Sequence, residues 1–106
     1  MTAAISPQEQ KEKTLSPEIL AALIIVSADF YLQQSTKQYI DLKDQTVQWE
    51  QLFRLPLTDG HRAAIGWAYS IWNQAPHPTC NPFETASSMD SELKKAVLRA
   101  LALRWG

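Results

Sequence analysis

The stretch SPEILAALIIVSADFYL, residues 16–32, decides the fold class of this chain. Ser16 and Pro17 are residue types preferred at a helix N-cap and at the first helical position, so together they predict a helix start. On a helical wheel the apolar side chains that follow occupy every face, with Asp29 set among them. A helix that is apolar nearly all round is buried on most sides, by its own chain or by a partner protein. We therefore expect one continuous helix over residues 16–32 at the centre of a helical domain.

The segment of residues 35–53 admits two interpretations. Five side chains at helical spacing form one stripe: Tyr39, Leu42, Thr46, Trp49 and Phe53. The alternative takes residues 39–42 and 46–49 as two short strands of a β-hairpin. Residues 43–45, which would connect these strands, contain no Gly, and good helix formers dominate the segment. We therefore favour a helix, with a break near residues 44–46 as a variant that gives two shorter helices.

Two further helices are predicted in the second half of the chain. Residues 58–59 supply the cap of a helix that runs to about residue 73. The last helix begins at about residues 88–90 and ends at residues 105–106, with acids at its start and bases later, as the helix dipole favours. Both segments carry apolar side chains at helical spacing, so both can pack against the first helix.

The remaining segments are predicted to be irregular. Residues 74–83 contain three prolines, which prevent regular structure, and we expect Phe83 to anchor this loop to the core. Residues 1–15 are small and polar and predict a flexible tail. The expected architecture is therefore all-α: a compact four-helix domain over residues 16–106 with a flexible N-terminal tail.

Composition limits where the protein is expected to act. The chain of 106 residues has a net charge of −1 and one cysteine, Cys80, so it has no internal disulfide and fits a reducing compartment. No signal peptide is recognisable. The longest apolar run, residues 19–26, has eight residues, against the roughly 20 that cross a bilayer. We expect a cytoplasmic protein that has no membrane partner.

No catalytic motif is recognisable in the sequence. It contains no Gly-rich phosphate loop, no paired-carboxylate signature, no His-Glu-x-x-His and no nucleophile elbow, so we expect no enzyme and no cofactor. His77 and Cys80 could offer two metal ligands, but a structural zinc site needs four, and we expect no metal. Asp29 in an apolar helix needs a partner, for which His61 and Arg62 are candidates. An enzymatic role would require Asp29, His61 and Cys80 to converge.

The hypothesis that we favour is a non-enzymatic protein-interaction module: an adaptor, an assembly factor, an inhibitor or a small subunit of a larger complex. The chain has four Trp, and Trp, Tyr and Arg are the residues that anchor protein interfaces. A partner protein or a second copy of the chain would cover apolar surface that the helices leave over. The candidate binding residues are Asp29, His61, Arg62, Trp67, Tyr69 and Trp105.

The alternative hypothesis is a regulator that binds nucleic acid with a helix-turn-helix-like pair. The predicted helices on either side of residues 55–58 would form this pair. Five side chains would face the major groove: Arg62, Gly66, Tyr69, Ser70 and Asn73. That face carries a single base and the net charge is slightly negative, whereas nucleic-acid binders normally present a basic surface. The balance of charge therefore disfavours this alternative.

Overall fold

The computed structural model describes residues 15–105, and this part of the chain is mostly helical. Its elements, in chain order, are α2 (Pro17–Val26), α3 (Phe30–Thr36), the 3₁₀ turn η1 (Lys37–Tyr39), β1 (Ile40–Asp41), β2 (Thr46–Val47), α4 (Trp49–Phe53), α5 (Asp59–Asn73), α6 (Pro82–Thr85), the 3₁₀ turn η2 (Ala86–Ser88) and α7 (Ser91–Trp105). Most of the tail predicted for residues 1–15 lies outside the described residues. No helix within residues 15–105 combines the length and the apolar character that a membrane span requires.

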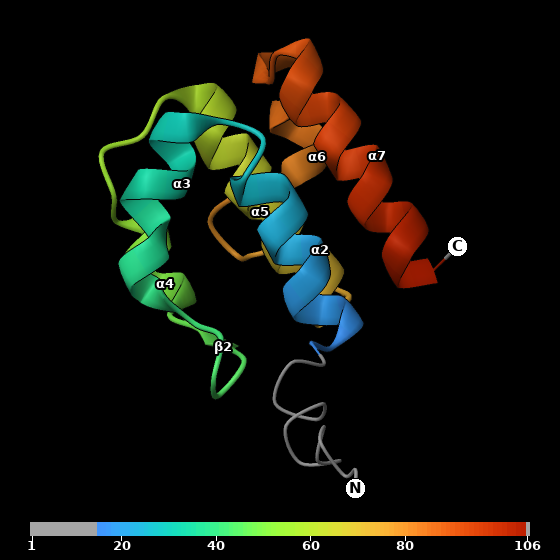
Figure 1. Ribbon diagram of the computed structural model, residues 1–106. Helices are drawn as coiled ribbons and strands as arrows, with labels where there is room; N and C mark the ends of the chain where they lie inside the picture. The colour runs from blue at the N-terminus through green and yellow to red at the C-terminus, as the bar shows by residue number, and fades with distance from the viewer. Residues whose placement is uncertain (1–14, 106) are drawn as a thin grey trace, which may run out of the picture.

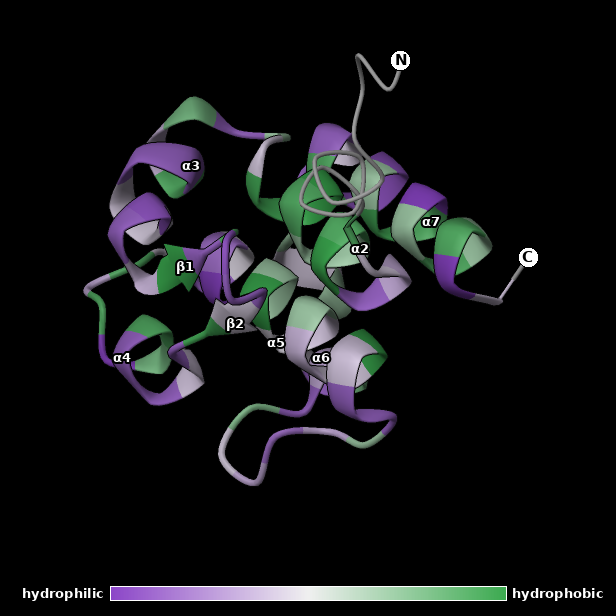
Figure 2. Cartoon of the chain, turned by 60° about the horizontal axis from the view of Figure 1, so that its bottom comes forward, coloured by the Kyte–Doolittle hydropathy of each residue, from purple (hydrophilic) through white to green (hydrophobic). Residues whose placement is uncertain are grey.

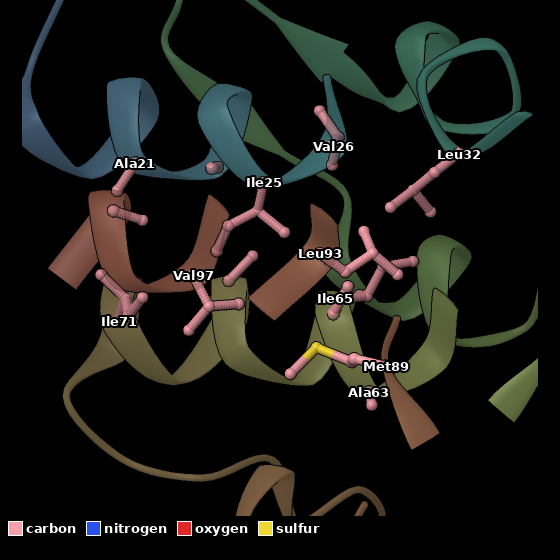
Figure 3. Close-up of a cluster of buried hydrophobic side chains, with 14 of the residues drawn as sticks. Ala21, Ile25, Val26, Leu32, Ala63, Ile65, Ile71, Met89, Leu93 and Val97 are labelled. Carbon is pink, nitrogen blue, oxygen red and sulfur yellow. The ribbon is translucent and has the colours of Figure 1, made fainter. Parts of the chain in front are cut away.

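Three helices, α2, α5 and α7, form the core. α2 packs against both α7 and α5, and α5 also packs against α7. The α3–β-hairpin–α4 segment lies on the opposite side of the molecule from α7 (Figure 1). The buried cluster between the core helices includes Ile25 of α2, Ile65 of α5 and Val97 of α7 (Figure 3). The expectation of a mostly helical fold is confirmed, but a simple four-helix arrangement is not.

Alanines let the three core helices approach one another closely. Seven alanines of these helices are buried: Ala21, Ala22, Ala63, Ala64, Ala68, Ala96 and Ala100. A side chain of this size adds little distance between two packed helices, and Ala is also the residue with the highest helix propensity. The larger Ile, Leu and Val side chains fill the space between these contacts.

The helix predicted over residues 16–32 is wrong in its second half. α2 ends at Val26, and Asp29, in an extended conformation, occupies the N-cap position of a separate helix, α3. The break contains Ser27 and Asp29, residue types that favour caps and turns over helix interiors. Asp29 makes no side-chain cap hydrogen bond, because its carboxylate bonds to His61. α2 itself is as apolar as expected (Figure 2), with Ser16 at its N-cap accepting a hydrogen bond from the backbone N–H of Ile19.

The single helix favoured over residues 35–53 is also wrong, and the hairpin alternative describes the middle of this segment. β1 and β2 pair antiparallel, with Ile40 opposite Val47. In place of a Gly turn, the carboxylate of Asp41 accepts hydrogen bonds from two backbone N–H groups of the loop, and Gln45 adopts a left-handed φ of 55°. The side chain of Gln45 also accepts a hydrogen bond from the backbone N–H of Ser16, at 2.8 Å, which ties the hairpin to the start of α2.

The two helices predicted in the second half of the chain are confirmed. Thr58 caps α5 with its hydroxyl, and Asp90 accepts a hydrogen bond from the backbone N–H of Leu93 in the first turn of α7. The loop between them includes the short elements α6 and η2. The expectation that Phe83 anchors this loop in the core is wrong, because its side chain is 73% exposed. Pro82, at the first position of α6, is the buried residue instead.

A glycine fixes the position of α5 relative to η2. A Cβ atom on Gly60 would lie 2.6 Å from the backbone carbonyl oxygen of Ser88. Gly66 is also crowded, but its nearest neighbour, at 3.0 Å, is the Sγ atom of Cys80, a side-chain atom that can move. The backbone of η2 can move away from a Cβ atom at position 60 only if the connection into α7 moves with it.

We predict that Gly60→Ala lowers the free energy of unfolding by about 1–3 kcal/mol, because the new methyl group overpacks the contact with Ser88. In an unhindered helix the same change would stabilise the protein by up to about 1 kcal/mol. Urea unfolding followed by circular dichroism measures the difference. Gly66→Ala is the matched comparison and should cost less, and a Gly60→Ala protein as stable as the wild type would contradict the close contact.

Candidate functional site

An apolar groove runs along one side of α7. Two adjoining hollows, each of about 300 Å³, share Trp67 and Leu101 as lining residues. The first is lined by Trp67, Ser70, Ile71, Gln74, Ala75, Pro76, Phe83, Leu101 and Trp105. The second is lined by Trp67, Ala86, Met89, Lys94, Val97, Leu98 and Leu101. We call these two hollows together the α5–α7 groove.

Large apolar side chains at the edge of this groove are exposed. Phe83 is 73%, Leu98 66% and Trp105 52% exposed. On α7, Lys94, Leu98, Leu101 and Trp105 follow one another at i, i+4, i+7 and i+11, so they lie on one face of the helix. The groove therefore has a continuous apolar wall with one charged side chain, that of Lys94, at one end.

Aromatic contacts and an ion pair hold the groove in place. Trp67 of α5 packs edge to face against Phe83, with ring centroids 4.9 Å apart. At the end of α7, the guanidinium of Arg104 lies 5.0 Å from the ring centre of Trp105 and forms an ion pair of 3.2 Å with Glu18 of α2. Trp67 and Trp105, both candidate binding residues, therefore belong to the same surface.

Asp29 and His61, the first residues suspected of chemistry, form a pair. The Nε2–H of His61 donates to Oδ2 of Asp29 over 2.9 Å, and the imidazole stacks on Tyr31 with ring centroids 5.6 Å apart. Nδ1 of His61 is buried and has no hydrogen-bond partner among residues 15–105. The pair joins the first turn of α5 to the N-cap of α3, so it orients the two helices.

Arg62 and Tyr69 contact α4 and the segment after it, away from the groove. The guanidinium of Arg62 donates to the backbone carbonyl oxygens of Phe53 and Leu55, at 2.7 and 3.1 Å. Tyr69 packs edge to face against Trp49 and Phe53. These contacts satisfy carbonyl groups at the end of α4 and fix that short helix against α5.

The face of α5 expected to enter a DNA major groove is partly covered: Gly66 is buried, Arg62, Tyr69 and Ser70 are half-buried, and Asn73 is exposed with its side-chain amide donating to the carbonyl oxygen of Tyr69. Gly66 is buried against Cys80, and the hydroxyl of Ser70 donates to the backbone carbonyl oxygen of Gly66. The guanidinium of Arg62 is occupied by its two carbonyl contacts. Few donors of this helix remain available for base edges, which weighs against the nucleic-acid alternative.

His77 and Cys80 stabilise the proline-rich loop. Nδ1 of His77 accepts a hydrogen bond from the backbone N–H of Thr79, so Nε2 carries the proton and donates to Glu50 at 3.3 Å. The thiol of Cys80 donates to the backbone carbonyl oxygen of Arg62 at 3.6 Å. Within residues 15–105 no group of three or more His, Cys, Asp or Glu side chains is placed to hold a metal ion.

Burial makes Cys80 a weak nucleophile. It raises the pKa of the Cys80 thiol above 9.0, although the positive charge of Arg62 and a hydrogen bond with Thr85 act in the opposite direction. A thiol that keeps its proton near neutral pH does not attack substrates readily.

Comparison with protein-family models, curated proteins and solved structures finds no match.

Sequence reasoning missed part of the groove. Trp67 and Trp105 were identified as interface candidates, but Phe83, Leu98 and Leu101 were not. The spacing of Lys94, Leu98, Leu101 and Trp105 was visible in the sequence as one side of the last helix. Only the fold shows that this side faces α5 and α6 rather than α2.

We predict that Asp29→Ala and His61→Ala each lower the free energy of unfolding by about 1 kcal/mol, with a coupling of about 0.5–1 kcal/mol in the double variant. Partial solvent exposure of the pair keeps these values small. Urea unfolding of the four proteins measures the coupling. Asp44→Ala, which removes an exposed carboxylate from the hairpin loop, is the control, and additive effects of Asp29→Ala and His61→Ala would contradict the pair.

We predict that stability falls as the pH rises above 9.0, the ordinary pKa of the thiol, because Cys80 in the folded protein holds its proton more tightly. Below that pH both states are protonated and the thiol has no effect on stability. Urea unfolding between pH 7 and about 10.5, compared with Cys80→Ala, isolates this contribution from other groups. Parallel curves for the two proteins would contradict the prediction.

Proposed function

We propose that this protein is a non-enzymatic interaction module that binds a partner protein through the α5–α7 groove. The observation that carries the proposal is the continuity of the two apolar hollows through Trp67 and Leu101, with Phe83, Leu98 and Trp105 exposed beside them. Connected apolar surfaces of this kind mark interaction sites, whereas single exposed apolar side chains are ordinary. The proposed role is that of an adaptor, an assembly factor, an inhibitor or a small subunit, acting in the cytoplasm.

The composition of the groove matches the centre of a protein interface. Interface centres are enriched in Trp, Phe and Met and depleted in charged residues. The groove contains Trp67, Trp105, Phe83 and Met89, with Lys94 as its one charged residue. Large aromatic side chains contribute most of the binding energy at such centres, so Trp67 and Trp105 are the proposed anchors.

The residues most suited to catalysis lie outside the groove, which supports a binding role for it. The Asp29–His61 pair stacks on Tyr31, and neither residue lines the hollows of the groove. The Cys80 thiol is buried and keeps its proton. The polar side chains most suited to chemistry are thus engaged in contacts between helices.

We predict that Leu98→Asp abolishes partner binding while changing the free energy of unfolding by less than about 0.5 kcal/mol, since the side chain is largely exposed. Affinity capture from an extract of the host cells, followed by mass spectrometry, identifies proteins that the wild type retains and Leu98→Asp loses. Isothermal titration calorimetry with the purified partner then measures the affinity for both proteins.

Leu103→Asp is the matched control, because Leu103 is 42% exposed on α7 but does not line the groove. This variant should bind like the wild type. Equal binding by the wild type and Leu98→Asp would contradict the proposed site. A gel shift of generic duplex DNA at low salt that is unaffected by Leu98→Asp would favour the nucleic-acid alternative.

A further inference from the structure

The α5–α7 groove offers little to pair with a polypeptide backbone. The polar side-chain groups among its lining residues are those of Ser70, Gln74 and Lys94 and the indole N–H groups of Trp67 and Trp105. The Ser70 hydroxyl already donates to the carbonyl oxygen of Gly66, and Nε1 of Trp67 is buried, out of reach of a bound chain. An extended peptide would bring unpaired N–H and C=O groups into this apolar surface, at a cost for each. An α-helix satisfies its own backbone groups, so a helix is the form of chain that this groove accepts best.

The dimensions of the groove set the length of such a helix. The stripe covers residues 94–105 of α7, which is about 16 Å along the helix axis, or about three turns. A helix lying along this stripe would place its own apolar residues at i, i+3 or i+4 and i+7 against Leu98, Leu101 and Trp105.

The charge of the groove identifies the kind of helix. Lys94 is the one charged residue among those that line the two hollows, and no carboxylate lines them. Among residues 15–105 the ion pairs are His61–Asp29, His77–Glu50, Lys95–Glu92 and Arg104–Glu18, so Lys94 has no counterion there. The hydrocarbon stem of Lys94 lines the second hollow and its ammonium group lies at the exposed rim, where a carboxylate on the flank of a bound partner would pair with it.

A second copy of the chain does not supply a carboxylate to pair with Lys94. A symmetric dimer through the groove would use the same surface twice. Neither copy would bring a carboxylate from the lining of the two hollows. Glu92, the carboxylate of α7, lies on the flank beside α2 and pairs with Lys95 at 3.7 Å. The complement of this surface therefore lies on a different protein.

We infer that the α5–α7 groove binds an amphipathic helix of about three turns from a partner protein, apolar on one face and acidic on the flank that meets Lys94. This inference rests on the proposed function and adds the chemistry of the partner. The groove contributes shape and apolar area, and Lys94 selects for a negative charge at one end of the bound helix.

The test uses the full chain and two fluorescently labelled synthetic helices. Both carry the same apolar face of Leu residues, one with Glu and the other with Lys on its flanks. Fluorescence anisotropy at low salt should show roughly tenfold tighter binding of the Glu peptide. The preference should shrink at high salt, because exposed charges are screened. A proline in the middle of the Glu peptide should remove binding, because it breaks the helix.

Two charge reversals on α7 form a matched pair. Lys94→Glu should remove or invert the preference for the Glu peptide. Arg99→Glu makes the same reversal of charge on the flank of α7 that faces α2, and this variant should retain most of the preference for the Glu peptide. Leu98→Asp should weaken the binding of both peptides, and this loss would show that the peptides occupy the groove.

The outcomes separate this inference from the proposed function. Leu98-dependent binding of both peptides with equal affinity overturns the acidic preference and leaves the groove as a binding site. No binding of either peptide up to about 1 mM overturns the inference of a helical partner, whereas the proposed function is decided by the capture experiment with Leu98→Asp. A dimer that Leu98→Asp dissociates in light scattering assigns the groove to a second copy and overturns the inference. Leu98-dependent binding to phosphatidylserine vesicles, without peptide binding, assigns the groove to a membrane surface and also overturns the inference.

Discussion

The close approach of α2, α5 and α7 is the constraint on which the rest of the structure depends. Buried alanines on all three helices keep their axes near one another, so Ile25, Ile65 and Val97 can fill the space between them. Gly60, which has no side chain, likewise lets η2 approach α5 closely. Not every large side chain of these helices lies between them. On α5 and α7, Trp67, Leu98 and Trp105 lie beside the core rather than in it, and the groove is the result.

Much of the helical framework was predictable from local signals. Thr58 and Asp90 are strong caps, and the apolar spacing after each is regular, so α5 and α7 were located closely. The errors lie where a single polar side chain overrides that spacing. α2 ends at Val26 although the apolar pattern continues past it, and Asp29, extended at the start of α3, pairs with His61. The absence of Gly in residues 43–45 argued against a hairpin. The carboxylate of Asp41 stabilises the turn instead, by accepting hydrogen bonds from two backbone N–H groups.

The candidate site was predictable only in part, for a different reason. Trp67 and Trp105 attract attention by residue type. The cost of an isolated carboxylate on an apolar helix predicts a partner for Asp29, but it leaves His61 and Arg62 as equal candidates. Phe83 was assigned to the core because aromatic side chains usually pack there, but Pro82 occupies that position. Which side of α7 faces α5 depends on contacts between segments far apart in the chain. No pattern within the last helix contains that information, so the groove required the fold.

The hydrogen bond between the backbone of Ser16 and the side chain of Gln45 has a further consequence. This bond joins the tip of the hairpin to the start of α2, so the segment between them begins and ends at the same place in the molecule. Within residues 30–57, which we call the satellite, Leu32, Thr36 and Leu52 are fully buried. The other apolar side chains of the satellite that pack against the core, among them Tyr39, Trp49 and Phe53, are only partly buried. Regions with few buried contacts open locally at lower free energy than the core does. The satellite can therefore exchange its amide protons through its own openings, while the groove, built on α5 and α7 across the molecule, keeps its shape.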